Sequence, residues 1–575
     1  MHNRTSVSQR QKKLFADKNL WISVLIVSIP ALILGFMAGL FAFCDQLMMV
    51  KLIPNFLQTN QVFSNYEGYH SIYTSPNLPE DVKKIMMDAN GAIPSIIRTA
   101  VAYSAPITVF INAAALLLGN GTAINYSKYN GAKNLLMAEK TWTQGFYANL
   151  LLSIVVTALC CGICSALISL EQGAGLNDQL NTLAKTNYFI DHPDQFKTVA
   201  TFYHEYYDEV RRFASQYIYI MGAGCIFALY SQFISLLVIA EGKQVIVVAA
   251  SIICNGINIL LDWVFIKYAH LTMMGGAIAT DIGWLLNTLI CFSYIIYLER
   301  RSDTNLHMQA LRKINFKIRD YSELFALGLP SFVRNVSMAI ATTVQVALLV
   351  AVVNAAHPST ANISVYQSVY GAVNAIANLF WTALFGIING ARIICSYNYG
   401  ARNFKRVRGS YWVLIVFALI HTIISFGVVC FGINTFMLNL FDIDNSNITQ
   451  LNLANYILRI SIVQMAITAV GIGGMMVFQA TGRWWRAAIA GIMQGIIYCV
   501  PLSFIIQYAA IQIHNVDLFL WCPFIVVCCS SLTVFIWSIF YMRRHFLDKH
   551  AKLAPSLHNV KSVAQEEKIL KHSVD

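Results

Sequence analysis

Charged residues are scarce in this chain. Only 12% of its 575 residues are Asp, Glu, Lys or Arg, whereas an ordinary soluble domain contains about 25%. Hydrophobic residues make up 57%, against roughly 45–50% in such a domain. So few charges do not suit the surface of a soluble protein of this length. The composition therefore predicts an all-α integral membrane protein.

Long polar stretches are also rare, because hydrophobic runs recur along the whole chain. A run of about 20 residues suffices to cross a hydrocarbon core of about 30 Å as a helix. Twelve such runs are predicted to be membrane spans, at 20–50, 91–118, 142–170, 213–240, 244–266, 275–298, 323–353, 363–391, 409–440, 453–480, 485–508 and 518–542. The first is far longer than the hydrophobic region of a cleavable signal peptide, so we expect it to remain as a span.

Basic residues gather on one side when these spans are threaded through a bilayer. With the N-terminus inside, most of the 40 Lys and Arg residues fall in the cytoplasmic loops and tails. We therefore expect a multi-pass protein of the plasma membrane, monomeric, with both termini in the cytoplasm. Basic inner loops facing anionic lipid account for the net charge of +12, so no nucleic-acid partner is predicted.

The 13 cysteines do not suggest a disulfide framework. All of them lie in or at the ends of hydrophobic runs, where a free cysteine behaves as a small hydrophobic residue. No structural disulfide is predicted.

One stretch of sequence occurs twice. Asn120–Asn134 reads NGTAINYSKYNGAKN, and Asn389–Asn403 reads NGARIICSYNYGARN. A second matched pair is Gly242 in AEGKQ and Gly482 in ATGRW. Six spans per repeat is an even number, so both halves enter the membrane in the same direction. This arrangement predicts two parallel six-helix repeats around a central cavity, as in secondary transporters.

Proline marks the start of each repeat, with Pro30 in SIPALI and Pro330 in GLPSFV. Both are expected to bend their helices. The predicted organisation is a cytoplasmic N-tail (1–19), an N-lobe (20–298) with outer insertions near 51–90 and 171–212, a cytoplasmic linker (299–322), a C-lobe (323–542) and a cytoplasmic C-tail (543–575).

Carboxylates inside the spans are few, and each is costly. A charge near the bilayer centre costs about 2.5–3.5 kcal/mol on insertion scales, so embedded carboxylates are functional candidates. Asp45, Asp262 and Asp281 lie well inside predicted spans, and all three belong to the first repeat. The second repeat has no such residue, which indicates that any ion chemistry is confined to the N-lobe.

Three spans of the N-lobe present polar groups at one depth. At about 1.5 Å per residue, Asp45, Asp262 and Thr280 each lie roughly 6–8 Å inside the outer boundary. Asn255, Asn258 and Asp262 are spaced i, i+3 and i+7, so they share one helix face. These oxygens can take up a proton or bind Na⁺, and the sequence leaves both open. Hydrogen bonding between helices is the alternative role, particularly for the asparagines.

Other polar residues in the spans are weaker candidates. Asp281 lies about 100° round the helix from Thr280 and, like Asn255, is a possible additional member of the site. Arg98, Arg334 and Arg459 are near span ends, where long side chains can reach the interface. A substrate contact is the alternative for Arg334.

The repeated G…NYGA.N box, Leu261–Thr280 (LDWVFIKYAHLTMMGGAIAT) and SYNYGARN resemble the multidrug and toxic compound extrusion (MATE) family. The resemblance covers roughly residues 20–540. It implies twelve helices in two lobes, export of small, cationic amphipathic compounds coupled to H⁺ or Na⁺, and no cofactor besides the coupling ion.

Within that family the chain resembles the branch related to the DNA-damage-inducible proteins. The resemblance implies a cation-coupling site at Asp45, Asn258, Asp262 and Thr280, which are the residues that the depth argument selects. Arg392 departs from the family pattern, because Arg-Ile stands here where the family has Gln-Pro.

The leading hypothesis is a cation-coupled antiporter that works by alternating access on a small-molecule substrate. A flippase for a lipid-linked head group, as in related two-lobe exporters, is the second. A membrane-embedded enzyme is the third, because HEYYD (His204–Asp208) begins like a zinc motif but lacks its second histidine. No enzyme activity and no metal other than Na⁺ at the N-lobe residues is expected.

Overall fold

The computed structural model describes residues 12–312, 318–356, 360–431, 433–440 and 448–546, and every element in these ranges is helical. The first half contains η1 (Lys13–Asp17), α2 (Leu20–Leu52), η2 (Ile53–Asn55), α3 (Thr59–Val62), α4 (Tyr66–Tyr73), α5 (Glu80–Ile85), η3 (Ala89–Gly91), α6 (Ala92–Gly131), α7 (Leu135–Ala184), α8 (Asn187–Asp191), α9 (Pro193–Ala223), α10 (Cys225–Ala240), α11 (Gln244–Lys267) and α12 (Thr272–Arg300). The second contains η4 (Met308–Arg312), α13 (Ile318–Ala356), α14 (Thr360–Gly400), α15 (Phe404–Cys430), α16 (Ile433–Asn439), α17 (Ile448–Ala480), α18 (Trp484–Ile492), η5 (Met493–Ile497), α19 (Cys499–Ile513), α20 (Val516–Leu520) and α21 (Cys522–Phe546).

Twelve predicted spans find helical counterparts. Within the described residues, eleven helical segments are long and apolar enough to cross a membrane. A twelfth is made by α9 and α10 together, which are bent by 49° at Gly224. The integral-membrane, all-helical fold predicted from composition and hydropathy is confirmed.

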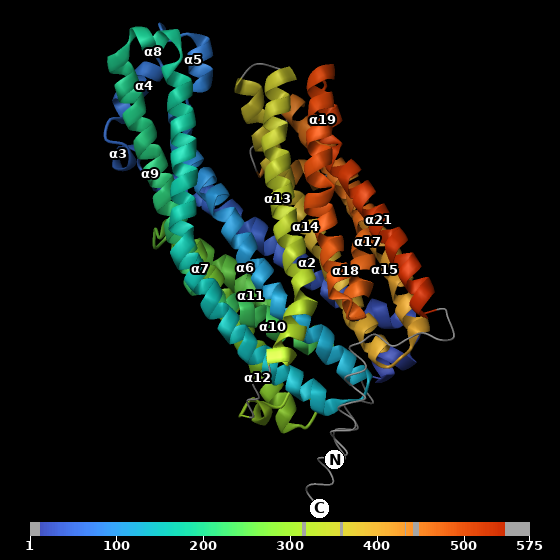
Figure 1. Ribbon diagram of the computed structural model, residues 1–575. Coiled ribbons are helices and arrows are strands. Elements are labelled where there is room, and N and C mark those ends of the chain that lie inside the picture. Colours follow the sequence, from blue (N-terminus) through green and yellow to red (C-terminus); the bar gives the residue numbers. More distant parts are fainter. Residues whose placement is uncertain (1–11, 313–317, 357–359, 432, 441–447, 547–575) are drawn as a thin grey trace, which may run out of the picture.

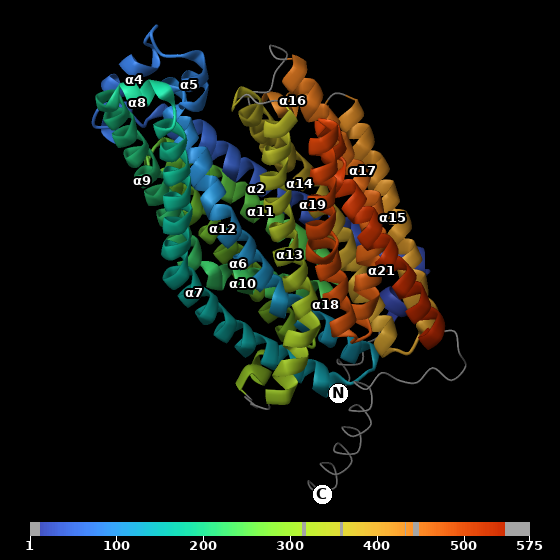
Figure 2. The same cartoon turned by 45° about the horizontal axis from the view of Figure 1, so that its top comes forward.

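The helices form two groups that diverge from one end of the molecule. In Figures 1 and 2, α6, α7, α9, α10, α11 and α12 lie in one group and α13 to α21 in the other. We call the end where α2 begins and α21 ends the tail end. The opposite end, which carries α3, α4, α5 and α8, is the insertion end. The two groups meet toward the tail end and separate toward the insertion end.

Helix α2 packs on α11 of the first group and on α14 of the second, and glycines bring it close to α14. A methyl group at Gly386 would stand 2.0 Å from the carbonyl oxygen of Ala31, and one at Gly390 would stand 3.1 Å from that of Val27. Helices α6 and α13 make the matching contact, where a methyl group at Gly328 would stand 1.6 Å from the carbonyl oxygen of Leu117. Backbones this close exclude any larger side chain, so the tail-end seam is tightly packed.

The duplicated sequence has a duplicated backbone. Lys133 after α6 and Arg402 after α14 have φ values of 60° and 58°, a left-handed conformation that is uncommon outside glycine. The next residue in each copy, Asn134 or Asn403, caps the following helix through its side-chain oxygen. The repeat NGTAINYSKYNGAKN therefore encodes the end of one helix and the start of the next, in both lobes.

Both prolines lie inside continuous helices. A glutamine side chain donates a hydrogen bond to a backbone carbonyl near each of them. Pro30 has no N–H to bond the carbonyl of Ile26, four residues earlier, and Gln244 Nε2 donates to that oxygen at 3.0 Å. Near Pro330, Gln479 Nε2 donates to the carbonyl of Leu327 at 3.4 Å. Gln244 therefore satisfies the carbonyl that Pro30 leaves without a backbone partner, whereas Gln479 bonds the carbonyl one residue further along from the corresponding position, Ala326.

The two predicted insertions fold together at the insertion end. Helices α7 and α9 extend beyond the rest of the N-lobe and are joined by α8, while α3 to α5 pack beside them (Figure 1). The ring of Tyr69 stacks on Phe202 with centroids 3.6 Å apart. Met87 joins the segments, because its carbonyl accepts from Tyr69 Oη at 2.7 Å and its N–H donates to Tyr203 Oη at 2.9 Å. The insertions thus make one small domain at the insertion end of the N-lobe, and its helix α5 also contacts α14 of the C-lobe.

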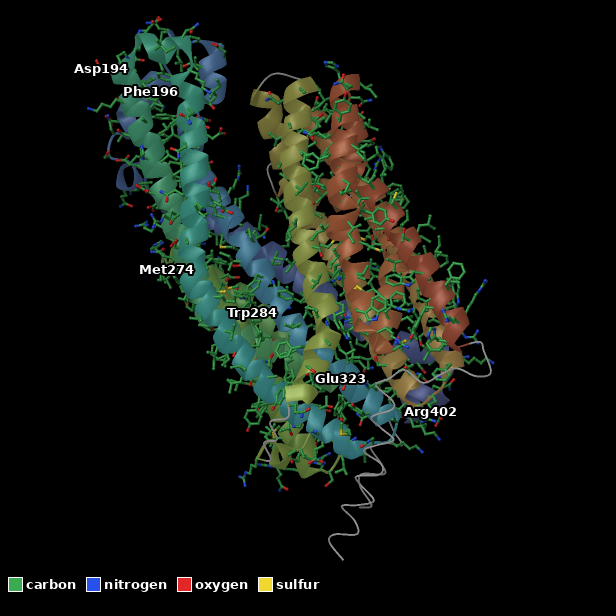
Figure 3. The ribbon with its side chains drawn as sticks, in the orientation of Figure 1. Asp194, Phe196, Met274, Trp284, Glu323 and Arg402 are labelled. Carbon is green, nitrogen blue, oxygen red and sulfur yellow. The ribbon has the colours of Figure 1, made fainter. Side chains whose placement is uncertain are left out.

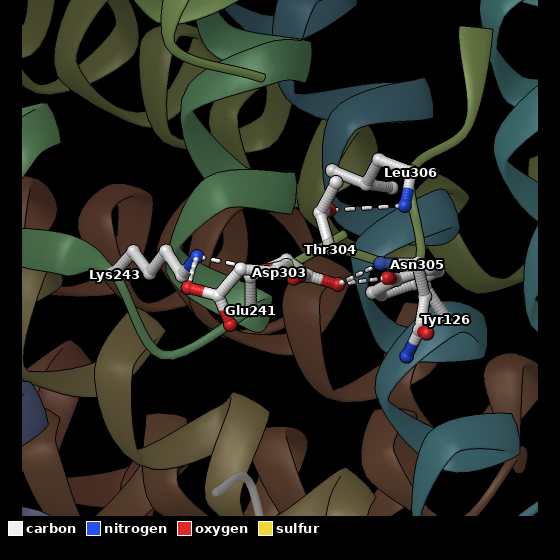
Figure 4. Close-up of polar contacts among 7 residues, drawn as sticks. All are labelled: Tyr126, Glu241, Lys243, Asp303, Thr304, Asn305 and Leu306. Atoms are coloured by element: carbon white, nitrogen blue, oxygen red, sulfur yellow. Dashed lines mark hydrogen bonds and ion pairs between the residues drawn. The ribbon is translucent and has the colours of Figure 1, made fainter. Parts of the chain in front are cut away.

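Polar contacts hold the beginning of the inter-lobe segment against the N-lobe (Figure 4). Glu241, just after α10, accepts hydrogen bonds from the Tyr126 hydroxyl and from the backbone N–H of Asn305. Lys243 Nζ pairs with Asp303 at 2.8 Å. Burial raises the pKa of the Glu241 carboxyl above its ordinary value. Residues 303–305 therefore belong structurally to the first lobe.

Candidate functional site

Asp45 lies near the insertion-end terminus of α2. Gly276 allows α12 to pack close to it there. Asp45 is buried, and a methyl group at Gly276 of α12 would stand 3.1 Å from its Oδ1. Gly276 precedes Thr280 by four residues, which is one helical turn, so both face the same way. Asp45 is thereby held beside the Thr280 face of α12.

Asp262 and Asn258 project from α11 toward the same region. Asp262 is 0% exposed and Asn258 is 1% exposed. A methyl group at Gly283 of α12 would stand 3.4 Å from the Cβ of Asn258, which places that asparagine against α12. The Asp262 carboxyl interacts electrostatically with that of Asp45. Three helices therefore bring the four predicted residues Asp45, Asn258, Asp262 and Thr280 into one buried cluster, which we call the N-lobe cluster.

Tyr217 joins this cluster from α9, and sequence reasoning missed it. Its hydroxyl lies close enough to the carboxyls of Asp45, Asp262 and Asp281 to interact with them electrostatically. The side chain is 5% exposed. Its surroundings in the sequence, SQYIYIMGAG, contain another tyrosine and no charge, so no local signal distinguishes it. Only the packing of α9 against α12 and α6 brings it to Asp45.

Asp281 occupies the break between α9 and α10. A methyl group at Gly224 would stand 2.0 Å from the Cγ of Asp281, so the carboxyl fills the space that a side chain there would need. Gly224 caps α10, whose N-terminus favours a neighbouring negative charge. Asp281 therefore lies beside the N-lobe cluster and is tied to the bend in the fourth span.

Most polar atoms of the N-lobe cluster lack a hydrogen-bond partner among the described residues. These atoms are Asp45 Oδ1, both oxygens of Asp262, Asn258 Oδ1 and Nδ2, and Thr280 Oγ1; Oδ1 of the neighbouring Asp281 lacks a partner in the same way. Buried polar atoms are normally hydrogen-bonded, so orphaned ones call for a ligand or a proton. Two nearby carboxylates that are both charged would repel each other, and cation uptake relieves that repulsion. The arrangement can hold H⁺ or a hard cation such as Na⁺.

The other polar residues of α11 and α12 behave differently. Asn255 is half-buried, and its Nδ2 donates to the carbonyl of Met37 and to Ser251 Oγ, each at 3.3 Å. This asparagine ties α11 to α2. Met274 and Trp284 flank Thr280 on α12. Figure 3 shows both between the insertion end and the tail end of the N-lobe.

The C-lobe holds a buried group of the opposite sign. Arg334 of α13 is 9% exposed and Arg392 of α14 is 5% exposed. The guanidinium of Arg334 lies over the Phe385 ring, 4.4 Å from its centroid. Arg392 Nη1 donates to Asn120 Oδ1 of α6 at 2.8 Å, across the two lobes. We call Arg334, Arg392 and Phe385 the C-lobe cluster. In contrast, Arg98 and Arg459 are exposed.

An inter-lobe ion pair lies at the tail end. Lys128 Nζ of α6 bonds Glu323 Oε1 of α13 at 2.9 Å. Lys128 is almost fully buried, whereas the Glu323 side chain is one-third exposed. Glu323 appears in Figure 3 where the two groups of helices meet. The two lobes are therefore joined by charge as well as by close packing.

Comparisons with known proteins agree with this architecture. The MatE family model matches residues 336–505, which run from α13 to α19. An uncharacterized protein of Mycoplasmoides gallisepticum is 28% identical over 533 residues, covering 90% of this chain and 89% of the relative. The multidrug export protein MepA of Staphylococcus haemolyticus is 21% identical over 410 residues, covering 71% of this chain and 78% of that protein.

A solved structure shares the fold. It is the outward-facing conformation of a multidrug resistance MATE family transporter of the MOP superfamily. It superposes with a TM-score of 0.69 at 18% identity, covering 92% of this chain and 97% of the other.

Proposed function

We propose that the chain is a transporter of the MATE type, a cation-coupled antiporter that exports small organic molecules by alternating access; its similarity to the MatE family model and to a multidrug export protein supports this. The protein is a transporter and not an enzyme. The observation that carries the proposal is the buried N-lobe cluster, in which both oxygens of Asp262 lack hydrogen-bond partners among the described residues. Uptake of H⁺ or Na⁺ there would supply the missing interactions.

The driving force follows from the charge moved. One positive charge entering at 100 mV provides about 2.3 kcal/mol, which supports roughly a fiftyfold gradient of a neutral solute. The cluster lies toward the insertion end of the N-lobe, on the side where the two groups of helices diverge (Figure 1).

Helix α2 can link cation binding to the movement of the lobes. It carries Asp45, and its glycines pack on α14, where a methyl group at Gly39 would stand 2.3 Å from Thr382 Oγ1. A change in how Asp45 packs against α12 therefore bears directly on the seam between α2 and α14. Such a bistable interface is the element that alternating access requires.

The test is transport by purified protein in liposomes under separately imposed H⁺ and Na⁺ gradients. Asp262→Asn should abolish gradient-driven efflux, because a neutral amide cannot exchange a cation charge. Asp194→Asn makes the same chemical change at an exposed site of the insertion end, far from the cluster (Figure 3), and should transport as the parent does. Gradient-driven efflux by Asp262→Asn equal to that of the parent would refute the proposal.

The coupling ion and the substrate remain predictions, as do the monomeric state and the plasma-membrane orientation with cytoplasmic termini. The family resemblance predicts a cationic amphipathic substrate. The buried arginines of the C-lobe favour the second candidate, a flippase for a lipid-linked head group, in one respect: they offer positive charge to a ligand. Translocation of labelled lipid in proteoliposomes separates the two functions.

A further inference from the structure

The C-lobe cluster places two positive charges inside the protein. Arg334 and Arg392 are both more than nine-tenths buried. The two guanidinium groups interact with each other electrostatically, so they lie close enough for repulsion. Arg392 follows Phe385 by seven residues on α14, which puts both on one face of that helix. Arg334 lies over that face, because its guanidinium stacks on Phe385.

The described residues bring no carboxylate to either guanidinium. Arg334 donates to the amide oxygen of Asn335 at 3.3 Å, and Arg392 donates to that of Asn120. Arg392 Nε has no hydrogen-bond partner among the described atoms. Neutral amides compensate poorly for a buried charge, and a second like charge nearby adds to the cost. A buried, uncompensated pair of arginines is therefore poorly explained by stability.

The location connects the pair to the meeting point of the lobes. Asn120, the partner of Arg392, also donates to Ser331 Oγ at 3.1 Å. Ser331 accepts a second hydrogen bond from Gln479 Nε2 of α17 at 3.1 Å. Helices α6, α13, α14 and α17 thus meet around the arginines, toward the tail-end side of the diverging lobes. The arginines therefore lie at the seam between the lobes.

We propose that Arg334 and Arg392 bind an anionic group, a phosphate or a carboxylate, of the molecule that the protein transports. Guanidinium groups present planar donors that match the oxygens of such anions. The Phe385 ring beside them offers an apolar surface to the rest of the ligand. The anion would balance the positive charge of the two arginines, just as a cation would balance the carboxylates of the N-lobe cluster.

This inference rests on the proposed transport function but concerns a different lobe, so the two can fail separately. The anion site predicts binding to the purified protein without any ion gradient. The antiport mechanism predicts gradient dependence whatever the substrate. Asp262→Asn should therefore keep the anion site while losing ion-driven efflux.

The experiment measures binding to the full chain in a neutral detergent, by the shift in thermal midpoint and by equilibrium titration. Two anionic probes distinguish the source of the anion: dioctanoyl phosphatidate as a lipid head group, and phenyl phosphate as a soluble organic anion. Tetraphenylphosphonium serves as the cationic probe. We expect a saturable rise of the midpoint with at least one anionic probe.

The variants test the two arginines. Arg334→Gln and Arg392→Gln should each weaken the binding of the anionic probe by about tenfold to a hundredfold, the usual worth of a hydrogen bond to a charged group. Arg459→Gln removes an exposed arginine of the same lobe and should bind as the parent does. Arg334→Lys and Arg392→Lys keep the charge, so they should retain part of the affinity and report on folding if the glutamine variants are unstable.

Each outcome decides. Response to the phosphatidate alone supports a lipid head group, and response to phenyl phosphate supports a soluble organic anion. The inference is overturned if the parent binds neither anion, if it binds only the phosphonium cation, or if the glutamine variants bind anions as tightly as the parent. Anion binding that is intact with no effect of ion gradients on transport would overturn the antiport mechanism instead.

Discussion

The N-lobe and C-lobe clusters lie on duplicated scaffolds and carry opposite charge. Asp45 and its equivalent, Gln345, each lie fifteen residues after the proline that opens their repeat. Arg334 corresponds to Leu34 by the same register. The backbone of the two repeats is shared down to the left-handed turn after the second span, yet each lobe has charges where the other is neutral. Duplication preserved the architecture, and divergence gave each half a separate charge.

A second contrast lies in the helices that surround the clusters. The fourth span is broken at Gly224, where Asp281 fills the gap, whereas the tenth span, α17, runs unbroken from Ile448 to Ala480. A polar site in the N-lobe therefore comes with a bend that exposes backbone groups to a carboxylate. The C-lobe arginines instead lie between continuous stretches of α13 and α14.

The largest expected effect comes from replacing Asp45 by glutamine, the residue at the equivalent position of the second repeat. Asp45→Gln removes one of the two central carboxylates, so at 100 mV the accumulation ratio of a neutral substrate should fall from about fiftyfold to about one. Counterflow and gradient-driven uptake in liposomes measure it. Gln345→Ala, at the equivalent position of the C-lobe, should retain ion dependence. If both variants retain it, the two lobes do not differ in ion coupling.

Filling the break of the fourth span should have an intermediate effect. The added methyl group of Gly224→Ala would occupy the space of the Asp281 carboxyl, and overpacking of this kind costs about 1–3 kcal/mol. Thermal unfolding in detergent measures the loss. Gly256→Ala is the matched control in the same lobe, because nothing lies within 4 Å of the added methyl group. Equal midpoints for the two variants would mean that Asp281 does not need the gap.

The smallest effect separates a structural asparagine from one of the cluster. Asn255→Ala removes the hydrogen bond to the Met37 carbonyl, and interhelical bonds in membranes average about 0.6 kcal/mol. Its unfolding midpoint should fall slightly while ion-driven transport persists. Asn258→Ala, by contrast, should impair transport, because that side chain is buried beside Asp262. Loss of transport in Asn255→Ala would extend the N-lobe cluster by one turn.

Hydropathy located the spans but underestimated several helices. The predicted second span, 91–118, ends thirteen residues short of α6, because 119–131 is rich in glycine and polar residues. That segment is nevertheless buried, since Gly121 and Gly131 pack on the backbone of the C-lobe. The ninth predicted span, 409–440, is divided in the structure between α15 and α16. Hydropathy measures affinity for lipid, so it does not detect a polar helical segment that is buried against protein.

The sequence identifies candidate site residues where a side chain is energetically costly in a membrane. A charged carboxylate inside a membrane span costs free energy whichever way its helix is rotated. Asp45, Asp262 and Asp281 can therefore be picked out from the sequence alone. Tyr217 and Gly224 carry no such cost. Arg334 allowed two interpretations, because an arginine near a span end can reach the interface, and Arg392 was marked only by its departure from the family pattern.

The sequence by itself determined the membrane setting, the helical spans, the duplication and the side of the duplication that holds embedded carboxylates. Each of these follows from composition, run length or repetition along the chain. Only the tertiary structure decided that Tyr217 meets Asp45, that Asp281 fills the gap at Gly224, and that two arginines share a buried region beside the seam. The reason is that such contacts depend on helix rotation and interhelical distance. Glycine contacts between distant segments set both, and no local pattern records them.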